Sequence, residues 1–317
     1  MLLVVGEVRT CLLHNSGPLE QPLVTQLLEL VPGQRVRTAE RPVPRATSPE
    51  LTHGVDCPLA VASRARARGI GTVTSHAVIT GGLVLQGSAK AQLRRAAAGH
   101  RLTWSHYARQ PSVIEVIGQP DAVDLASGYL ADASPTSALD LGSVSEHIIG
   151  IVQMRPYLDH ATSVRTRPTR VRWVAELGDY DVSISRVHMQ SDVLRTVELT
   201  VREDQLGLVA RFCEDFALHD WLLTTIKQII EQADRARAGG RESMDVLRPA
   251  VERLLHLWMP GAHVDRVMRP LWEVIELEPG FSREWNAQVA RIRDQIALET
   301  LQVLELLERA KRTSVEW

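Results

Sequence analysis

Short apolar runs broken by glycine and proline fill the chain up to about residue 201, and longer helical periodicities follow. Short runs with turn residues between them are typical of β-strands. Strands are therefore expected at 2–13, 113–117, 171–175, 182–187 and 195–201. Helical spacing predicts helices at 19–30 and 141–154, and the proline-rich segment 34–58 is expected to be extended or looped.

The clearest local pattern is a β-hairpin over residues 71–91. Two apolar runs, TVTSHAVIT and LVLQGSAKA, flank Gly81 and Gly82, a dipeptide typical of a two-residue hairpin turn. In that register Ile79 faces Val84. Because apolar residues fall on both faces of the hairpin, we expect it to be covered on both sides.

After residue 203 the apolar positions recur with the 3.6-residue period of a helix, most regularly over 205–232. Further helices are expected over 244–258, over 264–277 and from residue 282 to about residue 312. These patterns predict an α+β protein. Its β-rich N-terminal domain would comprise residues 1–201, and its all-α helical C-terminal domain would comprise residues 202–317.

The last predicted helix has an unusual C-terminal end. Its first half carries one apolar face, which runs from Trp285 to Ile296, whereas Leu301, Leu304 and Leu307 belong to apolar positions on more than one face. A helix end of this kind must be buried in more than one direction. We therefore expect a partner chain or the N-terminal domain to cover it.

The composition is that of an ordinary soluble globular protein, with 317 residues, 44% apolar residues, 23% charged residues and a formal charge of −2. Three distant cysteines support neither a disulfide framework nor a structural zinc site. The apolar run at the N-terminus is too short for a signal sequence or a membrane span. A cytoplasmic protein without membrane insertion is expected.

The near-neutral charge conceals an acid-free basic window over residues 57–114. The window contains no Asp or Glu and has aromatic residues among its basic groups. Its members are Arg64, Arg66, Arg68, Lys90, Arg94, Arg95, Arg101 and Arg109, with Trp104 and Tyr107 between them. These arginines are either solvated on both sides of the hairpin, some of them paired with carboxylates of the other domain, or they form a surface for an acidic protein, for self-association or, less favoured, for nucleic acid.

Asp215 and His219 are the candidate catalytic residues, because residues four apart share one face of the helix predicted over 205–232. His219 also lies on the apolar stripe of that helix, which favours a buried structural histidine oriented by Asp215. Two residues do not make a catalytic zinc site, and the sequence has no HExxH, P-loop, GxSxG or suitably placed GxGxxG motif. No metal or cofactor is expected.

Six segments carry a resemblance to an uncharacterised actinobacterial protein family. They are VGEVRTCLL at 5–13, GVDCPL at 54–59, WSHY at 104–107, FCEDFALHDWLLTT at 212–225, LLHLWMPGAHVD at 254–265 and RIRDQIALETL at 291–301. Members of this family are typically encoded beside a variant P-loop NTPase and a methyltransferase-like protein. The resemblance implies a cytoplasmic component of a multi-protein system with an NTPase as partner, and it implies no catalytic residue.

The sequence thus favours a non-enzymatic assembly or adaptor protein. It would self-associate, or bind a partner, through the last helix and the basic window. The alternative is a hydrolase or a metal-dependent enzyme that uses Asp215 and His219. A third interpretation is nucleic-acid or nucleotide binding by the basic window.

Overall fold

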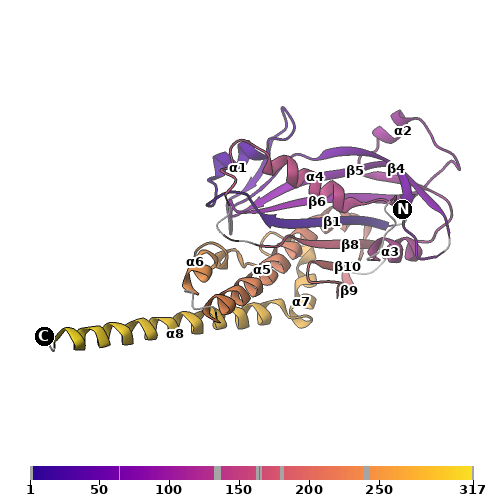
Figure 1. Ribbon diagram of the computed structural model, residues 1–317. Coiled ribbons are helices and arrows are strands. Elements are labelled where there is room, and N and C mark those ends of the chain that lie inside the picture. Colours follow the sequence, from indigo (N-terminus) through magenta and orange to yellow (C-terminus); the bar gives the residue numbers. More distant parts are fainter. Residues whose placement is uncertain are drawn as a thin grey trace.

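The computed structural model describes residues 3–63, 65–131, 137–161, 164, 166–178, 182–238 and 243–315. Its fold is α+β, as the sequence predicts: a mixed sheet occupies the N-terminal part, and helices follow (Figure 1). The strands are β1 (Leu3–Leu12), β2 (Arg37–Ala39), β3 (Arg45–Thr47), β4 (Leu51–Leu59), β5 (Ala67–Thr80), β6 (Val84–Arg95), β7 (Val113–Ile117), β8 (Thr169–Leu177), β9 (Ser183–Met189) and β10 (Leu194–Val201).

The helices lie on both faces of this sheet and beyond its edge. They are α1 (Gln21–Leu28), α2 (Trp104–Ala108), α3 (Ala122–Leu130), α4 (Leu141–Gln153), α5 (Leu206–Ala238), α6 (Met244–Arg253), α7 (Arg269–Leu277) and α8 (Phe281–Val315). The last helix begins one residue before Ser282. The Ser282 hydroxyl donates to Oε1 of Glu276 at 2.7 Å, and thereby ties the start of α8 to the preceding helix.

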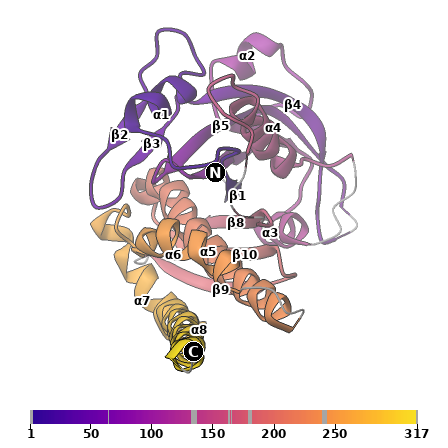
Figure 2. The ribbon, with the colours of Figure 1, turned by 60° about the vertical axis from the view of Figure 1, so that its left-hand side comes forward.

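Alternation along β1 shows how the sheet separates two layers of helices. Leu3 and Val5 belong to the apolar core that includes α3, whereas Val4 and Val8 belong to the core that includes α5. Successive side chains of a strand point to opposite faces, so one apolar strand can serve both cores. In Figure 2, α5, α6 and α7 lie between the sheet and α8.

The core on the α5 side crosses the boundary between residues 201 and 202. It combines β1, β8 and β10 with residues of α5, α6, α7 and the first part of α8. The change from strands to helices near residue 202 therefore does not interrupt the packing. Four of the tryptophans that the sequence concentrates near the C-terminus join or border this core: Trp221, Trp258, Trp272 and Trp285.

The 71–91 hairpin is present and buried on both faces, but its predicted register is wrong by one residue. Ile79 pairs with Leu85, and a three-residue turn ending at Leu83 replaces the two-residue turn. The turn is held from outside: the Leu83 carbonyl accepts from the Leu13 N–H at 2.8 Å, and the Gly82 carbonyl accepts from the Leu19 N–H at 2.8 Å. Leu83 is itself buried, so the packing of the turn against the rest of the protein outweighs the local preference of Gly81 and Gly82 for a two-residue turn.

The segment 34–58 is extended, and much of it joins the sheet as β2, β3 and β4. In β4, Pro58 pairs with Arg68 of β5. Proline is tolerated there because the Pro58 carbonyl accepts from the Leu139 N–H at 2.9 Å, so residue 58 turns its backbone polar groups away from β5, the strand that β4 pairs with.

Candidate functional site

Helix α8 has two halves with opposite environments. Its inner half packs on the helical layer, with Trp285 and Ile292 buried, and the Gln295 amide donates to Oδ1 of Asp234 on α5 at 2.6 Å. The Glu299 carboxylate still lies 3.4 Å from Nη2 of Arg237 on α5. From residue 300 to residue 309 every side chain is exposed, and this end of the helix projects from the body of the molecule (Figure 1). We call residues 298–309 the outer half of α8.

The outer half of α8 exposes six large apolar side chains. Each is between 52% and 63% exposed: Leu298, Leu301, Val303, Leu304, Leu306 and Leu307. Two sides of the helix are involved, because at 3.6 residues per turn Val303 and Leu306 continue the buried stripe, whereas Leu301 and Leu304 face away from it. Within the described residues the N-terminal part of the chain does not cover this end.

Some basic side chains of the window form ion pairs with nearby carboxylates. Arg68 and Arg101 contact the same carboxylate, Asp56, at 2.7 and 3.3 Å, and the Lys90 ammonium lies 3.2 Å from Glu50. The acidic partners lie just before the window in the sequence, and not in the helical part. Nearby carboxylates therefore neutralise three of the predicted interaction residues.

The remaining members of the window differ in environment. Arg66, Arg94 and Arg95 are exposed, and Arg64 lies outside the described residues. Trp104 is also exposed, and the Arg101 guanidinium lies 5.4 Å from the centre of its ring. The other aromatic residue of the basic window, Tyr107, is buried, and its hydroxyl accepts from the Leu102 N–H at 3.0 Å.

Asp215 and His219 are both buried, and both are engaged in holding a loop against α5. The Met259 N–H donates to Nε2 of His219 at 3.1 Å, so the other ring nitrogen, Nδ1, carries the proton and donates to the Asp215 carbonyl at 2.7 Å. Burial lowers the pKa of His219, in keeping with a neutral ring. Neither ring nitrogen is left for a metal or for proton transfer.

The Asp215 carboxylate has its own structural partners. Its Oδ2 accepts from the Gly261 N–H at 2.8 Å and from the Trp272 indole at 3.0 Å. The distance from Oδ2 to Nδ1 of His219 is 3.9 Å, too long for a hydrogen bond. Among the residues that the structure describes, no group of three or more His, Cys, Asp or Glu side chains could hold a metal ion.

The neighbouring residue, Glu214, is the centre of a buried ionic cluster that sequence reasoning missed. Its Oε2 lies 2.6 Å from Nη2 of Arg45 on β3, and its Oε1 lies 2.7 Å from Nε2 of His76 on β5. Burial alone raises the pKa of Glu214, but the charge and hydrogen bond of His76 and the Arg45 guanidinium outweigh it and lower the pKa to about 2. The cluster borders a cavity of about 400 Å³.

Comparison of the chain with protein-family models, with curated proteins and with solved structures finds no match. Geometry alone therefore decides which of these features carries function. No helix in the described ranges has both the length and the apolar character that a membrane crossing needs.

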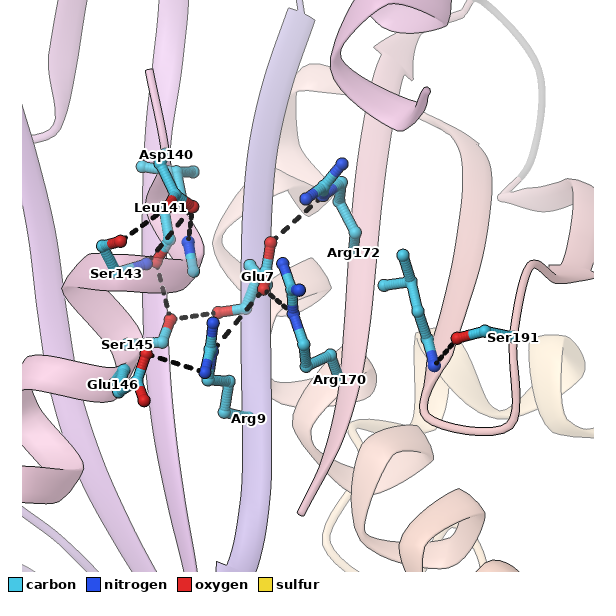
Figure 3. Close-up of polar contacts among 12 residues, drawn as sticks. Glu7, Arg9, Asp140, Leu141, Ser143, Ser145, Glu146, Arg170, Arg172 and Ser191 are labelled. Carbon is cyan, nitrogen blue, oxygen red and sulfur yellow. Dashed lines mark hydrogen bonds and ion pairs between the residues drawn. The ribbon is translucent and has the colours of Figure 1, made fainter. Parts of the chain in front are cut away.

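A second buried carboxylate, Glu7 on β1, is surrounded by arginines of β8 (Figure 3). Its two oxygens contact Nε of Arg170 at 2.7 Å and Nε of Arg172 at 3.1 Å. The Ser145 hydroxyl of α4 donates to the Glu7 carbonyl at 2.9 Å, next to the α4 N-cap, Asp140. This network fastens α4 and β8 to the central strand, and it borders none of the larger cavities among the described residues.

One sequence signal could have revealed Glu214 and its partners. Residues 72, 74 and 76 of β5 and 86, 88 and 90 of β6 are polar and point to the α5 side of the sheet, and they alternate with small or apolar residues. A polar row on a buried face needs hydrogen-bond partners, so it indicates a polar site beneath α5.

Proposed function

We propose that this protein is an assembly component that associates with a second copy of itself through the outer half of α8. The exposed apolar side chains of that half carry the proposal. Monomeric proteins rarely leave large apolar side chains contiguous on a projecting helix, because water contact makes this unfavourable. Burial of one leucine stabilises an interface by about 1.5–3 kcal/mol.

Leu301, Leu304 and Leu307 lie on one side of the outer half, within about 120° at 3.6 residues per turn. In an antiparallel pair of α8 helices that cross at Leu304, Leu301 of one copy faces Leu307 of the second copy, and the two Leu304 side chains meet. This self-complementary spacing supports a closed two-fold pair of identical chains.

Pairing along this side leaves a second apolar side free, with Val303 and Leu306. That remaining surface supports a second candidate function, in which the paired outer halves of α8 bind another protein. The P-loop NTPase implied by the family resemblance is the first such partner to test by pull-down. The basic window contributes less to this proposal, because Asp56 and Glu50 already neutralise part of it.

The two other functions have weaker support. An enzyme that uses Asp215 and His219 would have to break the hydrogen bonds that hold the 259–261 loop. Nucleic-acid binding by Arg94 and Arg95 would weaken steeply with salt and on their replacement by alanine. Salt-insensitive or absent binding to DNA and RNA would remove that interpretation.

Two complementary charged substitutions test the proposed pairing. Leu301→Arg and Leu307→Glu should each weaken self-association several-fold, because each places two charges against leucine in the pair. An equimolar mixture of the two variants should form a mixed pair that is more stable than a pair of either variant, because the introduced arginine then meets the introduced glutamate at one end and leucine meets leucine at the other. If the mixture stays as weakly associated as each variant alone, the antiparallel arrangement is wrong. Native mass spectrometry of the full chain resolves the three species.

A further inference from the structure

The cavity beside Glu214 lies on the α5 side of the sheet, between β2, β3, β5 and β6 and the first turns of α5. Basic side chains dominate its wall. Four lining residues are arginine or lysine: Arg37, Arg45, Lys90 and Arg211. The lining carboxylates are Glu50 and Glu214, which leaves an excess of two positive charges from these side chains before any charge on His76 is counted.

Both lining carboxylates are already engaged by cations. Glu214 contacts Arg45 and His76, and Glu50 contacts Lys90. The excess charge is therefore carried by Arg37 and Arg211, which are exposed and have no ion pair among the described residues. A ligand that complements this wall must be an acceptor of hydrogen bonds and must carry about two negative charges.

Arg45 supplies a further donor. It is 4% exposed, its Nη2 is bound to Glu214, and its Nη1 has no hydrogen-bond partner among the described residues. His76 donates from Nε2 to Glu214, and when the ring is protonated its Nδ1–H is a further donor for a ligand. Buried donors without partners are costly, and anionic oxygens satisfy guanidinium groups best.

We propose that this cavity binds a small phosphate monoester. A phosphate monoester carries between 1.5 and 2 negative charges at neutral pH and presents acceptor oxygens only, which matches a wall of donors. The cavity has a volume of about 400 Å³, many times the roughly 30 Å³ that one water molecule occupies, so a phosphate group fills only part of it. The remaining space, next to Leu208 and Ala210, suits the organic part of the molecule.

Isothermal titration of the full chain with phenyl phosphate tests this inference independently of self-association. We expect saturable binding at one site per chain, weakened at least about tenfold by Arg211→Ala or Arg37→Ala, the effect of one lost charged hydrogen bond. Both residues are exposed, so the variants should unfold at the wild-type temperature. Arg35→Ala is the matched control, because Arg35 is exposed, lies two residues from Arg37 and does not line the cavity.

Inorganic phosphate and succinate are titrated in parallel. Weaker binding of both supports a phosphate monoester. Equal binding of inorganic phosphate would overturn the organic part of the proposal, and equal binding of succinate would overturn the choice of phosphate. Absence of saturable phenyl phosphate binding, or an equal loss in Arg35→Ala, would overturn the site itself.

Discussion

Replacement of Glu214 by glutamine removes one charge from the centre of the buried cluster and leaves a side chain of nearly equal size. The cluster joins three distant segments, β3, β5 and α5, through contacts of 2.6 and 2.7 Å. Glu214→Gln leaves the Arg45 guanidinium buried without its counter-charge. Breaking a buried ion pair in this way costs about 3–5 kcal/mol of folding free energy.

The pKa of Glu214 gives an independent magnitude. A decrease from 4.5 to about 2 on folding corresponds to about 3 kcal/mol of stabilisation at neutral pH, at 1.36 kcal/mol per pH unit. Because the folded-state pKa is the lower one, this stabilisation is complete above pH 4.5 and is lost as the pH falls from 4.5 towards 2. The two magnitudes agree on about 3 kcal/mol.

Urea denaturation followed by circular dichroism measures this effect. At pH 7 Glu214→Gln should lower the free energy of unfolding by about 3 kcal/mol, and the difference from wild type should shrink below pH 4.5. Glu50→Gln is the matched control at the same cavity. The Glu50 side chain is 42% exposed, so its pair with Lys90 contributes at most about 1 kcal/mol. A loss below 1 kcal/mol for Glu214→Gln, or a difference independent of pH, would refute this reasoning.

Three further changes have defined outcomes. His219→Ala should lower the free energy of unfolding by about 2 kcal/mol in urea denaturation, because the Met259 N–H loses its acceptor. Neither this variant nor the wild type should contain a bound metal ion, and a stoichiometric metal in the wild type would favour the enzyme alternative. Gly82→Ala should lower the free energy of unfolding by at least about 2 kcal/mol and the melting temperature with it, because the φ of Gly82 is +64° and a Cβ there would lie 2.1 Å from the Leu19 carbonyl oxygen. Gly99→Ala is the control and should have no such effect, because a Cβ at Gly99 would have no atom within 4 Å. Burial raises the pKa of Cys11 to about 12, so at pH 8 its alkylation by iodoacetamide should be at least about tenfold slower in the folded protein than in urea, because the scarcer thiolate outweighs its higher nucleophilicity. Equal rates would contradict the raised pKa.

Local periodicity in the sequence was sufficient to predict most elements of this fold. The helix expected over 205–232 is α5, and the strands expected at 113–117, 171–175 and 195–201 are β7, β8 and β10. Each has an apolar pattern with one dominant period, so no tertiary information is needed to identify it. Register is different, because contacts of Leu83 and Gly82 with residues 13 and 19 decide the hairpin turn.

The candidate sites were less predictable, for a physical reason. Asp215 and His219 share a helix face, as their spacing predicts, but their bonding partners come from residues 259, 261 and 272. Glu214 meets Arg45 and His76 only because the sheet brings β3 and β5 under α5. Sequence spacing reports neighbours on one element and carries no information about partners from other elements.

The mass of the full chain in solution, measured by light scattering over a concentration series, tests the central claim most directly. We expect wild-type protein to form pairs, and Leu304→Glu to weaken pairing at least about a hundredfold, since each pair loses two buried leucines worth about 1.5–3 kcal/mol each. Leu277→Glu is the control, because Leu277 is 80% exposed on α7, away from the outer half of α8, and should leave pairing unchanged. A wild-type protein that stays monomeric at every concentration, or a Leu304→Glu variant that pairs as tightly as wild type, would contradict the account.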